Sequence, residues 1–162
     1  MRTLACMIDG LGHGEEAEVA ALAALAYVEA NVEQSMPDLF SGCDAALKAT
    51  RGAAVGICLI DRSTATLDYA AVGNTRFALV GTTLEYLSGG NGIVGAGVNP
   101  MISEQRKIEH GMKAVMWTDG ISELIDFAPY RQLLEHDASE AANAILRDNA
   151  TPQDDACVLV WR

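Results

Sequence analysis

The sequence predicts an α+β fold, in which strands and helices occupy separate stretches of the chain. Short apolar runs follow one another through the middle of the sequence with only turns between them. Helical patterns gather near the beginning and near the end instead of alternating with single strands. Grouping of this kind is typical of α+β proteins, whereas strict alternation would indicate a parallel α/β sheet.

The first elements expected are one strand and two helices. The apolar run 3–8 ends at an Asp-Gly pair, which predicts a buried strand that meets a loop. An alanine-rich helix is expected over 15–32, because glutamates in its first turn suit the positive end of the helix dipole. A second helix is expected over 38–48, since Pro37 is well tolerated at a helix start.

The middle of the chain is rich in predicted strands. Short turn sequences separate four apolar or alternating segments: 53–60, 66–72, 76–80 and 84–87. Consecutive strands with short turns predict an antiparallel meander. A glycine-rich loop over 89–97 follows, for which we consider two interpretations, a mobile flap or a flexible connection.

The last third of the chain combines two strands with helical patterns. The segment 113–118 predicts a strand that again ends at an Asp-Gly pair. Helices are expected around three segments, 121–125, 130–135 and 139–148, and a last strand over 156–161. Because no internal repeat or linker interrupts the sequence, we expect a single domain over residues 1–162.

Composition excludes several classes of function. The formal net charge is −11, with no run among the eleven basic residues, which argues against nucleic-acid binding. The apolar stretch 17–32 contains Glu18 and Glu29, so no membrane span is predicted. The four cysteines form no C-x-x-C pair, and three lie in apolar runs, which predicts core thiols and a reducing, cytoplasmic compartment.

Aspartates recur at the ends of predicted strands. Apolar strands stop at Asp9 and at Asp119, and the last strand starts just after Asp154 and Asp155. Asp-Gly is a common turn pair, so each position alone also has a turn explanation. Carboxylates that a fold brings together repel each other unless a cation lies between them. Oxygen donors without a cysteine or histidine cluster favour Mg²⁺ or Mn²⁺, and the set predicts such a site.

The glycine loop after the first strand suggests a weaker alternative. Gly10, Gly12 and Gly14 lie between a strand and a helix, as in phosphate-binding loops. Early glutamates crowd this helix start with negative charge, and Glu15 stands where the dinucleotide fingerprint requires glycine. Nucleotide binding is therefore the less favoured hypothesis.

Four motifs occur in an order that resembles a known family. The sequence is similar to the SpoIIE-like branch of the metal-dependent phosphatases of the protein phosphatase 2C type, and especially to its small stand-alone members in stress signalling. The motifs are D-G-L-G-H-G at 9–14, A-V-G-N-T-R-F at 71–77, W-T-D-G-I-S-E at 117–123 and D-D-A-C-V-L-V at 154–160. The segment K-A-T-R-G-A-A at 48–54 also fits.

The resemblance implies a four-layer α-β-β-α sandwich of two mainly antiparallel sheets flanked by helices, with a binuclear Mn²⁺ or Mg²⁺ centre. It makes Asp9 the bridging ligand and the carbonyl of Gly10 a second contact. Asp119 and Asp154 would complete the shell of the first metal. Asp155 stays open as an alternative ligand, although the family pattern favours Asp154.

The resemblance also implies the reaction. Two cations would lower the pKa of a bridging water, and the resulting metal-bridged hydroxide would attack phosphorus in line. No side-chain nucleophile is required. The substrate would be phosphoserine or phosphothreonine on a regulatory protein, namely an anti-anti-sigma factor or a stressosome-type scaffold.

The sequence departs from the family pattern in two ways. One or two strands and an acidic Gly-Asp motif normally precede the first motif, so we expect weaker binding of the second metal. The alternative function is a catalytically impaired module that docks a regulatory protein. Leu11 stands where eukaryotic relatives have histidine, and His13 is expected to support the loop. For Arg76 the choice between a phosphate contact and a structural role stays open, and Glu123 is either near the metal ligands or part of a helix start.

Overall fold

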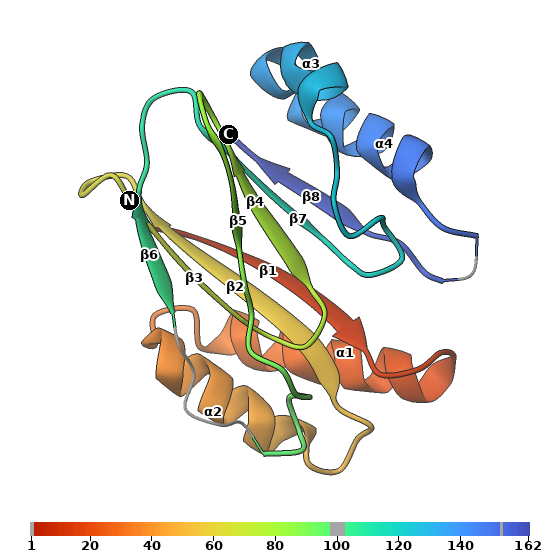
Figure 1. The fold of residues 1–162 in the computed structure, drawn as a ribbon. Helices are drawn as coiled ribbons and strands as arrows, with labels where there is room; N and C mark the ends of the chain where they lie inside the picture. Colours follow the sequence, from red (N-terminus) through yellow and green to blue (C-terminus); the bar gives the residue numbers. More distant parts are fainter. Residues whose placement is uncertain (1, 98–102, 153) are drawn as a thin grey trace. The chain divides into compact units, whose positions relative to one another are not determined.

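The computed structural model describes residues 2–97, 103–152 and 154–162, which form two compact units. One unit comprises Met1–Thr75 with Gly89–Lys107, and the other comprises Arg76–Ser88 with Ile108–Arg162. Each unit contains one four-stranded sheet in which all neighbours are antiparallel (Figure 1). The predicted α+β class with two antiparallel sheets is confirmed. The single domain over residues 1–162 stays a prediction.

The first unit is built on two long paired strands. Its sheet has the order β1-β2-β3-β6, with bounds Arg2–Gly10, Ala53–Asp61, Thr66–Val72 and Glu104–Lys107. Asp9 pairs with Ala54 and Gly10 pairs with Ala53. The strand thus continues two residues beyond the predicted boundary, and the first Asp-Gly pair lies inside the sheet ladder.

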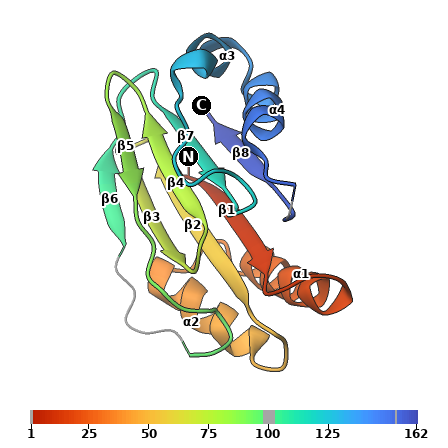
Figure 2. The ribbon, with the colours of Figure 1, turned by 45° about the vertical axis from the view of Figure 1, so that its right-hand side comes forward.

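Helices α1 (Glu15–Ala30) and α2 (Met36–Leu47) cover one face of this sheet (Figure 2). Alternate residues of β2 pack against buried side chains of α2 such as Leu39 and Phe40. α2 begins earlier than predicted because the Ser35 hydroxyl caps it, accepting a hydrogen bond from the Asp38 amide at 3.4 Å.

The loop over 89–97 is tied to the first unit. Val94 forms a backbone bridge with Ala53, through hydrogen bonds of 2.9 and 3.0 Å. The buried carboxylate of Asp44 in α2 accepts hydrogen bonds from the amides of Gly95 at 2.7 Å and Gly97 at 3.0 Å. These contacts favour a connection over a mobile flap, but the connection is anchored to the unit and not flexible at these residues.

The second unit has shorter strands. Its sheet has the order β5-β4-β7-β8, with bounds Leu84–Leu87, Arg76–Val80, Lys113–Trp117 and Val158–Trp161. The helical segments are η1 (Ala128–Tyr130), α3 (Arg131–His136) and α4 (Ala138–Asn149). α4 packs on β8, and its buried Ile145 shares a core with Trp117 and Ile121.

Two sequence predictions need correction, and one strand was not predicted. The predicted meander is wrong as one continuous sheet, since β2–β3 and β4–β5 are separate hairpins in different sheets. β6 was not predicted, because the segment Glu104–Lys107 has no apolar residue to indicate a strand. It forms by pairing with β3.

The helix predicted at 121–125 is also wrong. Ile121 instead forms an isolated bridge with Ala150, and its amide donates to the carbonyl of Thr118 at 3.1 Å. These long-range backbone bonds satisfy groups that a helix would have used internally. Among the residues described, no helix combines the length and apolar character that crossing a bilayer requires.

Candidate functional site

Asp9 and Gly10 close the first strand of the first unit. Asp9 is half-buried and pairs with Ala54 on β2. The chain then enters the Gly10–Gly14 loop, where the amide of Leu11 donates to the carbonyl of Gly52 at 2.9 Å. Sheet pairing and this hydrogen bond fix where the predicted bridging ligand leaves the strand.

The second unit brings together the segments that carry the other predicted ligands. The amide of Thr118 donates to the carbonyl of Cys157 at 3.2 Å, and the Thr118 hydroxyl accepts from the Cys157 amide at 3.0 Å. A Cβ atom at Gly120 would collide with the backbone carbonyl of Asp155. The loop that begins with Asp119 therefore lies directly against the segment that begins with the aspartate pair.

All three of these carboxylates are accessible. The side chains of Asp119, Asp154 and Asp155 are exposed. Asp154 accepts a hydrogen bond from the amide of Asp155 at 2.9 Å, which turns the chain just before β8. Asp154 and Asp155 both remain candidates for the ligand position.

A buried tryptophan supports this end of the unit. The indole nitrogen of Trp117 donates to the carbonyl of Ser122 at 3.2 Å, and its ring meets Tyr86 and Phe127 edge-on. The amide of Thr151 holds the same loop through the carbonyl of Gly120 at 2.8 Å. Sequence reasoning assigned no supporting role to Trp117 or Gly120, although both belong to the W-T-D-G motif that marked the site.

Arg76 and Glu123 have a structural contact with each other. Their side chains form an ion pair at 3.4 Å, with the Glu123 carboxylate largely exposed. Glu123 lies in an irregular loop, so the interpretation as a helix start is wrong. Arg76 pairs with Trp117 in the β4–β7 ladder, which places the ion pair beside the Asp119 loop.

The donor chemistry fits a hard divalent cation. Asp119 and the aspartate pair supply carboxylate oxygens from two segments that hydrogen bonds hold together, and such oxygens suit Mg²⁺ or Mn²⁺. Within the described ranges, no three histidine, cysteine, aspartate or glutamate side chains form a ready cluster for a metal ion. The joint use of Asp9 with Asp119 and Asp154 stays a prediction.

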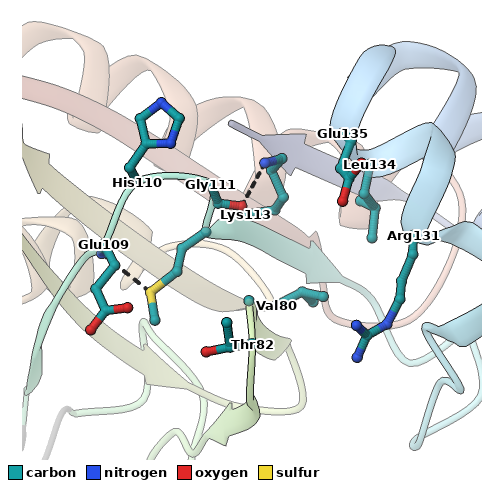
Figure 3. Close-up of a pocket in the computed structure, with 11 residues that line it drawn as sticks. Val80, Thr82, Glu109, His110, Gly111, Lys113, Arg131, Leu134 and Glu135 are labelled. Atoms are coloured by element: carbon teal, nitrogen blue, oxygen red, sulfur yellow. Dashed lines mark hydrogen bonds between the residues drawn. The ribbon is translucent and has the colours of Figure 1, made fainter.

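A separate pocket occurs at the other end of β7 (Figure 3). It has a volume of about 270 Å³ and contains none of the predicted site residues. The ammonium group of Lys113 donates to the carbonyl of Gly111 at 2.6 Å, while Arg131, Glu109 and Glu135 also line the space. Because carboxylates offset the cations there, this pocket does not favour a phosphate dianion.

The remaining candidates are placed as follows. His13, His110 and His136 are exposed, which confirms solvation for the last two.

The buried cysteines are not nucleophiles. Burial raises the pKa of Cys6 to about 12 and that of Cys43 to about 11, with smaller electrostatic contributions from Cys43 and Asp44 respectively. The pKa of Cys58 is also raised, again mainly by burial. These thiols stay protonated and do not act as nucleophiles.

A family comparison decides the relationship. The model for stage II sporulation protein E matches residues 1–162. The chain belongs to the SpoIIE family. No curated protein is similar enough to the chain to count as a relative.

Solved structures share the fold of this chain. One, described as the bacterial stressosome, a modular system adapted to control secondary messenger signaling, is 27% identical with a TM-score of 0.91, covering 99% of this chain and 85% of that one. RsbX in complex with magnesium is 24% identical with a TM-score of 0.82, covering 98% and 79%. The PP2C phosphatase domain of SpoIIE from Bacillus subtilis is 16% identical with a TM-score of 0.77, covering 98% and 54%. At these identities, the RsbX and SpoIIE structures show only that this chain has the same fold.

The comparisons confirm the family resemblance drawn from the four motifs. The chain is SpoIIE-like, and it shares the fold of RsbX and of the PP2C phosphatase domain of SpoIIE.

Proposed function

We propose that this SpoIIE-family protein is a metal-dependent serine/threonine phosphatase that acts on a phosphorylated regulatory protein. The observation that carries the proposal is the cluster in the second unit, where hydrogen bonds through Thr118 hold the Asp119 loop against the aspartate pair. The match of the whole chain to the family supports the same assignment.

The residues that would hold a divalent cation are Asp9, the carbonyl of Gly10, Asp119 and Asp154, with Asp155 as the alternative to Asp154. Such a cation supplies Lewis acidity, which activates water and stabilises charge on the phosphoryl oxygens. The protein itself contributes position. The β1–β2 ladder fixes Asp9, and the bonds of Thr118 fix the start of the Asp119 loop.

Exposure of the carboxylates suits a phosphate carried by another protein. Asp119 and Asp154 are exposed, so a phosphorylated loop can approach them without entering a deep cavity. A stressosome structure and RsbX with magnesium are among the structures similar to this chain. We therefore assign Mn²⁺ or Mg²⁺ as the cation, and an anti-anti-sigma factor or stressosome-type scaffold as the substrate, in a cytoplasmic signalling system.

The test measures hydrolysis of p-nitrophenyl phosphate with Mn²⁺ or Mg²⁺ by the unaltered chain, Asp119→Asn and Asp126→Asn. Asp119→Asn should lower the rate of hydrolysis at least about 100-fold, because it removes a metal ligand. Even residues that only hydrogen-bond to metal ligands change metal affinity or activity about 10- to 100-fold when they are mutated. Asp126 is the matched control, because it is an exposed aspartate in the same loop and its carboxylate accepts a hydrogen bond from the Ala128 amide at 3.0 Å. Asn keeps that acceptor, so Asp126→Asn should keep the full rate.

The result has two other outcomes. Equal rates in the unaltered chain and Asp119→Asn would contradict the proposed site. No hydrolysis by any of the three proteins would favour the alternative, a phosphatase-like module that docks a regulatory protein without cleaving its phosphate.

A further inference from the structure

Arg51 lies beside the loop that follows Asp9. It precedes β2 by two residues, and β2 begins at Ala53, the partner of Gly10 in the sheet ladder. The hydrogen bond between the Leu11 amide and the Gly52 carbonyl ties the neighbour of Arg51 to the same loop. The backbone alone therefore places Arg51 next to the predicted metal contacts of the first unit.

The side chain of Arg51 turns over this glycine loop. A Cβ atom at Gly12 would lie only 2.8 Å from Nη1 of Arg51, so the guanidinium rests against the backbone of Gly12. Its Nε forms an ion pair with Glu16 in the first turn of α1. Both partners are about half or more exposed, at 49% and 68% of their side chains, so the guanidinium faces solvent.

The other cations of the first unit are elsewhere. The unit contains six lysine and arginine residues. Among the described residues, Lys48 and Arg51 are the two that lie in the segment leading directly into the start of β2. The other four lie at the far end, where the ladder pairs Arg2 with Asp61 and the β6 residues with the start of β3. They are Arg2, Arg62, Arg106 and Lys107.

We propose that Arg51 binds the phosphoryl group of the substrate, an inference that rests on the proposed function. The carboxylates Asp9 and Glu16 make the neighbourhood acidic, so a phosphate dianion requires a cation there besides any metal. A guanidinium donates two parallel hydrogen bonds to phosphate, which a single ammonium group does not. The exposed ion pair with Glu16 is weakly held, so a dianion can replace it.

The experiment compares Arg51→Ala, Arg51→Lys and Lys48→Ala with the unaltered chain. Two substrates are used with saturating Mn²⁺, p-nitrophenyl phosphate and a phosphoserine peptide, and inorganic phosphate serves as a competitive inhibitor. Arg51→Ala should raise KM for both substrates and Ki for phosphate about 10- to 100-fold, because hydrogen bonds to charged groups are the stronger kind. Arg51→Lys should recover part of this loss. Lys48→Ala is the control: Lys48 is an exposed cation at the same end of the sheet, and its removal should leave KM and Ki as in the unaltered chain.

The outcomes separate this inference from the proposed function. Hydrolysis with unchanged KM and Ki in Arg51→Ala would overturn the role of Arg51 and leave the phosphatase assignment intact. A rise in KM confined to the peptide, or an equal rise in Lys48→Ala, would also overturn it, because either points away from a specific contact with phosphate. No hydrolysis by the unaltered chain would overturn the proposed function first. A shift of the Mn²⁺ activation constant in Arg51→Ala would show a role in metal binding instead.

Discussion

The two units hold their Asp-Gly pairs in different ways. In the first unit, Asp9 and Gly10 are the last residues of a nine-residue strand and remain in the ladder with β2. In the second unit, Asp119 and Gly120 lie beyond the end of the five-residue strand β7. Side chains and loop backbone, not strand pairing, hold the second pair in place.

This difference indicates where each site is vulnerable. A ladder distributes its hydrogen bonds over many residues, so changing one side chain near Asp9 removes little of the support. The Asp119 loop depends on a few specific contacts, through Thr118, Gly120 and Trp117. Substitutions in the second unit should therefore affect metal binding and stability together.

The largest effect is expected for Gly120→Ala. The new Cβ would collide with the Asp155 backbone carbonyl, which has no freedom to turn aside, and such overpacking costs about 3 kcal/mol. Urea unfolding should show this loss, and Mn²⁺-dependent hydrolysis should fall at least about 10-fold, because the segments that carry the ligands must separate. Gly90→Ala is the control, since its Cβ would meet only the Ala71 carbonyl at an ordinary 3.7 Å. Equal stability of the two variants would contradict the close approach.

A smaller effect is expected for Trp117→Phe. The change removes the hydrogen bond to Ser122 and part of a fully buried ring, and it should lower the free energy of unfolding by about 2 kcal/mol. Leu124→Ala tests the same loop at a side chain that is 72% exposed, and it should change stability by less than about 0.5 kcal/mol. If both variants unfold alike, the indole does not support the loop.

Thr118→Val should lower the free energy of unfolding by about 1 kcal/mol, because the methyl groups of valine cannot accept the hydrogen bond from the Cys157 amide. Affinity for Mn²⁺, measured by calorimetric titration, should fall about 10-fold, as for residues that position metal ligands. Thr118→Ser keeps the hydroxyl and should bind Mn²⁺ as the unaltered chain does. A loss of affinity in Thr118→Ser as large as in Thr118→Val would show that the methyl group matters instead.

The smallest effect is expected for the pH dependence of stability that the thiols of the first unit cause. Well below pH 9 these thiols are protonated in both the folded and the unfolded chain, so they do not make the free energy of unfolding depend on pH. Above it the unfolded thiols ionise, while the pKa values of Cys6 and Cys43 are about 12 and 11 in the folded protein. The free energy of unfolding should therefore decline between pH 9 and 11, which urea titrations at each pH would measure. Cys6→Ala combined with Cys43→Ala should flatten this decline, and an unchanged slope would contradict it.

Labelling with iodoacetamide at pH 8 provides an independent check on the same thiols. Cys157 is exposed and should react first, whereas buried Cys43 and Cys58 should react only after unfolding. Rapid labelling of Cys43 or Cys58 in the folded protein would contradict their burial.

Most helices and strands could be predicted from the sequence, because apolar runs bounded by turn residues mark them locally. The strands Thr66–Val72, Arg76–Val80 and Leu84–Leu87 have the predicted bounds. Elements that depend on distant partners were missed or misplaced. β6 exists through its pairing with β3, and the segment from Ile121 is held by Ala150 instead of forming a helix.

The candidate site was predictable in part for the same reason. The aspartates could be found because each adjoins an apolar strand, and the resemblance assigned them roles. Their supports could not, since the contacts of Gly120 with Asp155 and of Thr118 with Cys157 span more than thirty residues of sequence. Arg51 belonged to a recognised segment, but only its approach to Gly12 indicated a role for the side chain.

The polar strand β6 has a consequence for behaviour in concentrated solution. It forms one edge of the first sheet and consists of Glu-Gln-Arg-Lys, half of it exposed. An unpaired edge invites strands from neighbouring molecules, and a short edge rich in charge discourages such growth. Replacing its charged residues with valine would make this edge strand prone to pair with strands of other molecules, and the protein prone to aggregate.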